Sequence, residues 1–414
     1  MMSTIEILSG INMQSIGFND FYRTTKLSPD SDDFFSWVRT FKSSSSGQSF
    51  LDFGVADAFL PLADKLSSSL SALAVSQDHH GYVYGHPEYE AACLKRATRY
   101  AGADLFLQVL PTSGAKSALN LLCLALINPG DVILVTTPAY PIFSIMAQRL
   151  GGKVIELPLL PENDFMPDLE GLDRALLREA KILVVNYPNN PTGKIASQQE
   201  WDLLLEICIS HGILLINDAA YSDLLTETHP RGSLFRDKRA AGHCIEVHSL
   251  SKSLQIPGWR LGFILATPEI IEPLRILALL QESGQPKVLL DAVTQVIGDQ
   301  QIMEEVSACV AERRDILVSI LTEQGFNIAN SNGAFFVYVQ CPSGVFGGTA
   351  FSSSKEFSQY LASELGILTI PYQISGRSHV RFSVAFKGDA NVIFDQLRRQ
   401  LSSVRFIFSK GATP

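Results

Sequence analysis

Between about residues 58 and 285 the chain alternates short apolar segments with longer stretches that have the apolar spacing of helices. Strands that alternate with helices favour a sheet whose strands run mostly parallel, because each helix carries the chain back to the edge where it started. The sequence therefore predicts an α/β domain with its ligand site beyond the carboxyl ends of the strands. The candidate strands are residues 132–135, 154–157, 182–185, 213–216, 245–247 and 261–265, with helical patterns such as 115–126 and 198–211 between them.

The pattern changes after about residue 290. A long helical stretch covers residues 292–321, strand-like runs follow at 334–339 and 380–384, and a last helix is predicted over 390–401. A chain of 414 residues with 46% apolar content is larger than one ordinary domain. We therefore expect two domains, the second of which is a smaller α+β domain.

The composition argues against several classes of partner. A formal net charge of −9 disfavours nucleic acid and anionic membranes, and no apolar run is long enough to cross a bilayer. The six cysteines are scattered without a C-x-x-C pair, which favours free thiols in a reducing compartment. The first basic residue is Arg23, so a basic leader is not indicated and we expect a cytoplasmic protein. The eight histidines show no metal-binding spacing, and His79 and His80 are interpreted as a surface pair.

A lysine follows the strand predicted at 245–247, in the segment SLSKS. An isolated lysine at such a place is usually a solvated charge, whereas a nucleophilic lysine needs partial desolvation or nearby cations to lower its pKa. Arg260 lies eight residues after Lys252. A phosphate group would explain Ser249, Ser251 and Arg260 together, because two hydroxyls and a forked guanidinium are suitable donors.

Polar and aromatic residues also follow three other predicted strands. They are Tyr140 in the segment PAYP, Asn190 in NNPTG, and Asp218 with Tyr221 in NDAAY. Each has an ordinary structural explanation, namely an aromatic residue covering the core, a turn, and a helix N-cap at Asp218. Since the carboxyl ends of parallel strands share one edge, we expect these residues to converge on one crevice.

The segment Ser113-Gly114-Ala115 opens the helix predicted over residues 115–126. A glycine-containing turn at a helix N-terminus can bind an anion, because backbone N–H groups and the helix dipole both favour negative charge there. A simple N-cap at Ser113 is the structural alternative.

Taken in order, these motifs resemble those of the fold-type I pyridoxal 5'-phosphate (PLP) enzymes, specifically the class I/II aminotransferases of the aspartate aminotransferase superfamily. The resemblance runs from about residue 51 to 385. The pattern S-x-S-K-x-x-x-x-x-G-x-R-x-G occurs at residues 249–262, N-P-T-G at 190–193, D-x-A-Y at 218–221, S-G-A at 113–115 and V-R-F-S at 380–383.

The resemblance implies the catalytic roles. Lys252 would form the Schiff base (aldimine) with PLP and then move the proton of the substrate α-carbon. Asp218 would keep the ring nitrogen protonated, so that the ring remains an electron sink. Asn190 and Tyr221 would hydrogen-bond the ring oxygen, and Tyr140 would stack on the ring.

The resemblance also implies the binding residues and a homodimer. Arg381 would bind the substrate carboxylate bidentately, with Asn190 and the Gly54 backbone as further contacts. One phosphate ligand would come from the partner subunit, with Tyr82 as the first candidate and Tyr84 as the alternative. The remaining phosphate ligands would be Ser113, Gly114, Ala115, Ser249, Ser251 and Arg260.

The family fold implies a large PLP-binding domain over residues 58–288, built on a mostly parallel seven-stranded sheet. Residues 289–414 would form the smaller α+β domain together with the N-terminal segment 1–57. The chain departs from the family in lacking a proline after Gly54 and in having Glu90 near a position where arginine is common. Arg377 either meets an acidic substrate or is a solvated loop arginine.

The expected reaction is the transfer of an amino group between an L-amino acid and a 2-oxo acid. The segment at residues 283–287 weakly resembles a stretch of diaminopimelate aminotransferases. A PLP-dependent C–S β-lyase on the same scaffold stays open, because the cofactor residues serve both reactions. A non-catalytic PLP-sensing regulator would need a DNA-binding module, for which the residues before about Leu51 are too few and insufficiently basic.

Overall fold

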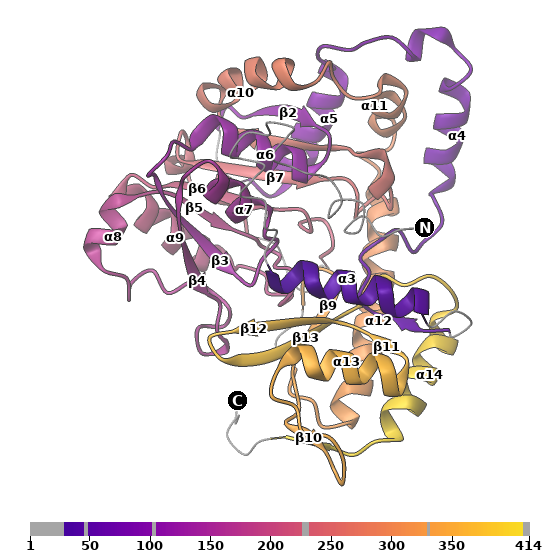
Figure 1. Ribbon diagram of the computed structural model, residues 1–414. Coiled ribbons are helices and arrows are strands. Elements are labelled where there is room, and N and C mark those ends of the chain that lie inside the picture. Colours follow the sequence, from indigo (N-terminus) through magenta and orange to yellow (C-terminus); the bar gives the residue numbers. More distant parts are fainter. Residues whose placement is uncertain (1–28, 45–48, 102–104, 226–231, 329–331, 409–414) are drawn as a thin grey trace, which may run out of the picture.

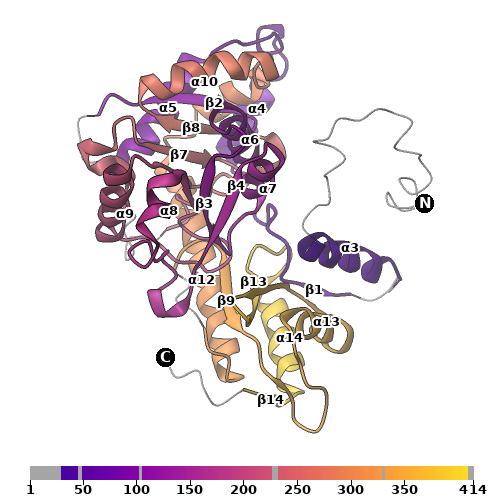
Figure 2. The ribbon, with the colours of Figure 1, turned by 60° about the vertical axis from the view of Figure 1, so that its left-hand side comes forward.

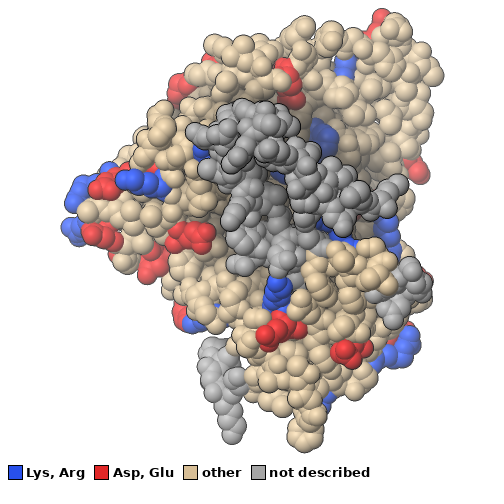
Figure 3. All heavy atoms as spheres, in the orientation of Figure 1, with Lys and Arg blue, Asp and Glu red and all other residues tan. Residues whose placement is uncertain are grey.

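The computed structural model describes residues 29–44, 49–101, 105–225, 232–328 and 332–408 (Figure 1). Most of the predicted N-terminal segment therefore lies outside the described residues. Among the described residues, no helix is long and apolar enough to cross a membrane. In the space-filling view, acidic and basic side chains are spread over the visible face and gather together near its left corner, where α8 lies (Figure 3).

The central sheet has seven strands in the order β2-β8-β7-β6-β5-β3-β4. Strands β3 to β7 pair in parallel, and β8 runs antiparallel to both of its neighbours, β7 and β2. The predicted mostly parallel, seven-stranded α/β fold is thus confirmed. The strands are β2 (Gln108–Thr112), β3 (Val132–Thr137), β4 (Lys153–Pro158), β5 (Ala180–Val185), β6 (Leu214–Asp218), β7 (Cys244–Ser249) and β8 (Gly262–Ala266).

The six predicted strands correspond to β3 through β8, whereas β2 was not predicted. Pro111 lies inside β2 and weakens its strand pattern, because proline lacks the backbone N–H that a central strand needs. The structure accommodates it because β2 is an edge strand.

Alternate residues of each strand point to opposite faces of the sheet, and helices cover both faces (Figure 2). In β3, Ile133 and Val135 pack in one core cluster, and Val132 and Leu134 in the other. The face with Ile133 and Val135 is covered by helices α6 (Ala115–Leu126), α7 (Ile142–Arg149) and α10 (Pro268–Gln281). The face with Val132 and Leu134 is covered by α4 (Asp64–Leu73), α5 (Pro87–Ala97), α8 (Arg174–Glu179), α9 (Gln198–His211) and α11 (Lys287–Thr294).

Helix α9 begins and ends where its sequence dictates. Ser197 accepts a hydrogen bond from the Glu200 backbone N–H, and the Glu200 carboxylate accepts one from the Ser197 backbone, which forms a capping box. Gly212 adopts a left-handed conformation with φ 70° and ends the helix.

A second, three-stranded antiparallel sheet has the order β12-β13-β9. It shares a core with the N-terminal strand β1, which pairs in parallel with β11. The elements are α3 (Pro29–Ser44), β1 (Leu51–Asp52), α12 (Gln300–Glu323), β9 (Phe336–Gln340), β10 (Gly344–Val345), α13 (Ser354–Leu365), β11 (Ile367–Leu368), β12 (Ile370–Ile374), β13 (Arg377–Ser383), α14 (Ala390–Ser402) and β14 (Phe406–Ile407).

The domain boundaries stay a proposal. The predicted boundary after residue 288 falls inside α11, whose buried Leu290 and Val293 pack in a core cluster of the large sheet. Asp299 caps the next helix, α12, by accepting a hydrogen bond from the Gln301 N–H. Ile302 of α12 still packs in the core of the large sheet, whereas Val306 and Val310 pack in the core of the small sheet. Core packing therefore supports placing the boundary within the first turns of α12.

Two leucines of α9 test this description of the core. Leu205 is 1% exposed and Leu203 is 49% exposed, although both lie on the same helix. We expect Leu205→Ala to lower the free energy of unfolding by about 2–5 kcal/mol, because it leaves a cavity. Leu203→Ala is the matched control, with an expected change within about 0.5 kcal/mol. Urea denaturation measures both, and equal losses would contradict the packing.

Candidate active site

The polar residues predicted from the sequence converge at the carboxyl edge of the central sheet. Asp218 is the last residue of β6, Tyr140 follows β3, Asn190 follows β5, and Lys252 follows β7. A pocket at this edge is lined by Tyr140, Asp218 and Asn186, among others. Tyr140 is 42% exposed and lines this pocket, so its side chain is accessible to a ligand there.

The amine of Lys252 lies in a largely desolvated place. Nζ donates a hydrogen bond to the Ala56 carbonyl at 2.6 Å and lies 5.8 Å from the centre of the Phe335 ring. Burial lowers the pKa of Lys252 to about 8, and the positive charges of Arg260 and Arg381 act in the same direction against the carboxylate of Asp57. The amine is thus partly neutral near physiological pH, as a nucleophile or base must be.

Asp218 is shifted in the opposite direction. Its side chain is buried, and burial raises its pKa to about 6, although the Ala220 backbone N–H donates to Oδ1 at 3.3 Å. That bond closes a turn after β6, and no helix begins there, so the helix N-cap that the sequence left open for Asp218 is not formed. A buried carboxylate that lacks a cationic partner is costly, so this position favours a ligand with a positively charged group.

Asn186 is a site residue that sequence reasoning missed. Its Nδ2 donates to the Asp218 backbone carbonyl at 2.7 Å, and its Oδ1 accepts the Asn190 N–H at 2.9 Å. Asn186 therefore fixes the loop that carries Asn190 against the strand that carries Asp218. Its place directly after β5, four residues before Asn190, was the available signal.

Arg381 brings together three distant segments. Its Nη1 donates to Asn190 Oδ1 at 2.9 Å, and its Nη2 donates to the Gly54 carbonyl at 2.7 Å. The guanidinium carbon lies 4.3 Å from the centre of the Phe336 ring, and the buried Nε lacks a hydrogen-bond partner among the described residues. The arrangement holds a fixed, poorly hydrated guanidinium, which suits a carboxylate ligand.

The predicted phosphate ligands Ser113, Gly114 and Arg260 lie together where β2 ends and β8 begins, and we call this cluster the cradle. Gly114 has a φ of 83°, a conformation that favours glycine, and a Cβ there would lie 2.6 Å from Nη2 of Arg260, so the arginine would have to shift. Arg260 Nη2 points to the Ser113 carbonyl at 3.5 Å, and Ser249 Oγ accepts the Ser251 N–H at 3.2 Å. Ala115 is the first residue of helix α6, as predicted for an anion site at a helix N-terminus.

Glu282 is an unexpected neighbour of this cradle. Its carboxylate accepts hydrogen bonds from the Ser113 hydroxyl and from Gln285 Nε2. The sequence did not indicate it, because it lies 169 residues from Ser113 in the chain.

The predicted tyrosines occupy two different environments. Tyr221 is 8% exposed and packs edge-on against Phe335 and Phe336, with ring centroids 5.4 Å apart in each case. Burial raises the pKa of its hydroxyl, which therefore stays protonated and able to donate. Tyr82 and Tyr84 are 82% and 66% exposed and stack on each other in the loop before α5.

The segment from Pro371 to Arg381 forms the antiparallel pair β12–β13 rather than a loop. Arg377 lies in β13 and forms an ion pair with Glu162 across the surface. It is thus neither a freely solvated arginine nor free to meet a substrate without breaking that pair.

Residues 63–392 match the family model of aminotransferase class I and II. The chain belongs to this family. It is 33% identical over 311 residues to LL-diaminopimelate aminotransferase of Methanococcus maripaludis, which covers 73% of this chain and 74% of that protein.

Solved structures agree on the fold. Substrate-bound BacF from Bacillus subtilis has a TM-score of 0.82 at 24% identity and covers all of both chains. An aspartate aminotransferase mutant of Thermus thermophilus has a TM-score of 0.80 at 23% identity over 93% of this chain and 99% of that one.

The protein is therefore an aminotransferase, and these relatives favour that activity over the C–S β-lyase alternative. The family implies PLP as the cofactor, and an amino acid and a 2-oxo acid as substrates.

The lowered pKa of Lys252 predicts a pH-dependent stability of the protein without cofactor. The unfolded chain, with a lysine pKa of 10.5, binds more protons than the folded chain between pH 8 and 10.5. Stability from this group therefore rises with pH across that window. We expect Lys252→Met to be about 1–3 kcal/mol more stable than wild type at pH 7, with the difference shrinking toward pH 10. Urea denaturation of both proteins across this range is the measurement, and a pH-independent difference would contradict the assignment.

Proposed function

We propose that this aminotransferase binds PLP at the carboxyl edge of the central sheet, with Lys252 as the attachment lysine. One observation carries the proposal. Two buried groups with opposite pKa shifts lie at the same edge of the sheet. The pKa of the Lys252 amine is lowered to about 8, and the pKa of the Asp218 carboxyl is raised to about 6. An aldehyde would neutralise the first group, and a protonated ring nitrogen would pair with the second.

The residues present fit the cofactor. The phosphate would lie in the cradle of Ser113, Gly114 and Arg260, where a Cβ on Gly114 would fill the space beside the arginine, with Ala115, Ser249 and Ser251 as further ligands. The partly exposed Tyr140 lines the same pocket as Asp218, where its ring could stack on the cofactor. The hydrogen-bond donors of the cradle thus suit the phosphate, and the carboxylate of Asp218 suits the protonated ring nitrogen.

When bound, PLP supplies a ring that accepts the electron pair released from the substrate α-carbon. In our proposal Lys252 Nζ takes the α-proton and later returns a proton, as its depressed pKa allows. Asp218 holds a proton at the ring nitrogen, and the hydroxyl of Tyr221 and the amide of Asn190 donate hydrogen bonds to the ring oxygen. Arg381 and the amide of Asn190 orient the substrate by its carboxylate, while the Gly54 carbonyl holds the guanidinium in place.

We further propose LL-diaminopimelate as the first amino donor to test, because several relatives at 29–35% identity carry that name. Such a donor carries a second carboxylate. Arg377 is paired with Glu162, so its use for that carboxylate would require the pair to open. A half-reaction screen of amino acids, with one spectrum for each donor, identifies the substrate.

We also propose a homodimer in the cytoplasm. The support is Tyr82, which lies 82% exposed on the loop before α5 where a second copy could receive its hydroxyl. Sedimentation velocity tests the assembly, and a fully active monomer would overturn it.

Lys252→Ala tests the attachment site. We expect wild type with added PLP to show a visible absorption band of the covalently attached cofactor, and the variant to lose that band along with transamination. Lys153→Ala, which removes an exposed lysine of β4, is the matched control and should keep both. A Lys252→Ala protein that retains the covalent band would end the proposal.

Arg381→Lys tests carboxylate binding. Lysine keeps the charge but cannot form the bidentate bond or hold both Asn190 and Gly54. We expect kcat/KM to fall about 10²–10³-fold for the amino acid and the oxo acid alike, since charge-assisted bonds contribute about 1.5–3 kcal/mol each. Affinity for PLP should stay near the wild-type value. Loss of cofactor with unchanged substrate KM would contradict the role.

A further inference from the structure

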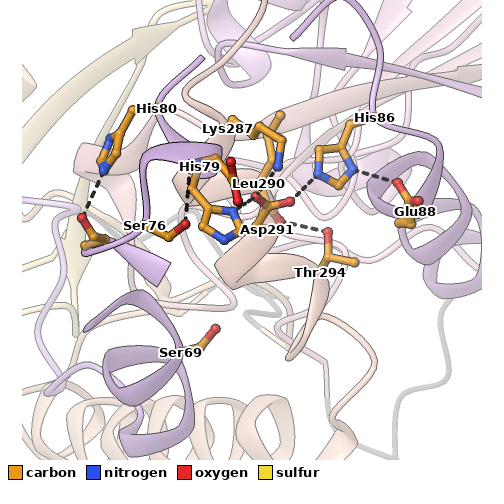
Figure 4. A network of polar contacts seen from close by, with 12 residues as sticks. Ser69, Ser76, His79, His80, His86, Glu88, Lys287, Leu290, Asp291 and Thr294 are labelled. Carbon is orange, nitrogen blue, oxygen red and sulfur yellow. Dashed lines mark hydrogen bonds and ion pairs between the residues drawn. The ribbon is translucent and has the colours of Figure 1, made fainter. Parts of the chain in front are cut away.

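The carboxylate of Asp291, outside the candidate active site, accepts hydrogen bonds from three basic side chains. Asp291 on α11 accepts hydrogen bonds from His79 Nδ1 at 2.5 Å and Lys287 Nζ at 2.7 Å on one oxygen (Figure 4). Its other oxygen accepts one from His86 Nε2 at 2.7 Å. Of the predicted surface pair, His80 is exposed, whereas His79 is half-buried because its ring is bound to Asp291.

The two histidines bracket the loop that carries the exposed tyrosines. His79 ends the short 3₁₀ helix before the loop, and His86 is the N-cap of α5 directly after it. Asp291 therefore holds both ends of residues 80–85 to one point on α11, while Tyr82 and Tyr84 between them extend into solvent.

A second contact holds the middle of the same loop. Gly284 has a φ of 93°, and a Cβ built on it would lie 1.9 Å from the Val83 carbonyl oxygen. The segment before α11 therefore approaches the loop as closely as a glycine permits. Residues 284–291 thus contact the loop at Val83 and bind the two histidines that flank it.

The charges of the cluster are consistent with a firm clamp. Burial alone would raise the pKa of Asp291, but the hydrogen bonds from Lys287, His86 and His79 hold it at about 2. Glu88 is a further titratable group nearby, with its carboxylate 3.5 Å from His86 Nδ1. Nδ1 accepts the Tyr89 backbone N–H, so Nε2 carries the proton that His86 donates to Asp291.

We propose that Asp291 is a positioning residue which, through His79 and His86, fixes the 80–85 loop so that one subunit presents Tyr82 to the cofactor phosphate of a second copy of this chain. The proposal rests on the proposed function, because it needs a tyrosine that crosses between subunits. A flexible loop would lose conformational entropy each time its hydroxyl bound a phosphate, whereas a fixed loop has lost it on folding. Loss of the clamp should therefore weaken cofactor binding without any change in a group that touches the cofactor.

A double-mutant cycle on the holoenzyme tests this. The variants are Tyr82→Phe, Asp291→Asn and the two together, and the readout is the dissociation constant of PLP. We expect Tyr82→Phe to weaken PLP binding about 10-fold or more through one lost hydrogen bond to a charged group. We expect Asp291→Asn to weaken it about 3–10-fold, and the double variant to bind no worse than Tyr82→Phe alone. Saturating PLP should return the kcat of Asp291→Asn to near the wild-type value.

Matched variants separate the clamp from general stability. Asp131→Asn removes another partly buried carboxylate with a lysine partner, Lys181 at 2.6 Å, and should leave PLP affinity unchanged. Gly284→Ala displaces Val83 without any change of charge and should weaken PLP binding as Asp291→Asn does. If Asp291→Asn fails to fold, Gly284→Ala in the same cycle carries the test.

The outcomes distinguish the two proposals. If neither Tyr82→Phe nor Tyr84→Phe changes PLP affinity, the borrowed tyrosine of the proposed function is wrong, and the clamp with it. If Tyr84→Phe alone weakens binding, the clamp stands only when its cycle with Asp291→Asn is non-additive. The clamp is overturned if a tyrosine variant weakens PLP binding but Asp291→Asn and Gly284→Ala do not. It is also overturned if the effects of these two variants simply add to the effect of the tyrosine variant. In both cases the role of the tyrosine in the proposed function stands.

Discussion

The candidate active site depends most on the hydrogen bonds that the guanidinium of Arg381 makes. Its hydrogen bonds to Asn190 and to the Gly54 carbonyl join strand β13 of the small sheet, a loop of the large sheet and the N-terminal segment. The cation lies against Phe336, so little water competes for it. A ligand carboxylate at this point would contact residues from both sheets at once, which makes substrate binding sensitive to how the two parts of the chain are placed relative to each other.

The sheet explains why so much of this site could be predicted. Parallel strands bring their carboxyl ends to one edge, so Tyr140, Asn190, Asp218 and Lys252 are neighbours by topology, although they are dispersed over more than a hundred residues. Glycine at 114 follows the same logic at shorter range, because its positive φ of 83° is one that L side chains rarely adopt. Motifs of this kind encode backbone geometry, and backbone geometry can be read from sequence.

Apart from Asn186, the features that were missed lie where sequence patterns carry no such signal. Glu282 and Asp291 meet their partners through packing between helices and loops, and nothing in their local sequence specifies those partners. The adjacent histidines at 79 and 80 suggested a surface pair, whereas the ring of His79 is bound to the carboxylate of Asp291. Strand β2 was hidden by Pro111, which only an edge position tolerates. Tertiary contacts decided all four cases, and local periodicity could not.

The opposite pKa shifts of Lys252 and Asp218 connect the fold to its chemistry. Burial works against the charged form of each group, so the folded chain pays in stability for a desolvated amine and a desolvated carboxyl at one edge of its sheet. A molecule that bonds covalently to the amine and places a cation against the carboxyl would relieve both costs at once, and its binding would stabilise the folded state in proportion. The same desolvation lowers the pKa of the amine to about 8, so that it is neutral often enough to act as a nucleophile and still accepts a proton near that pH. The cost to stability and the reactivity of the amine thus have a single physical origin.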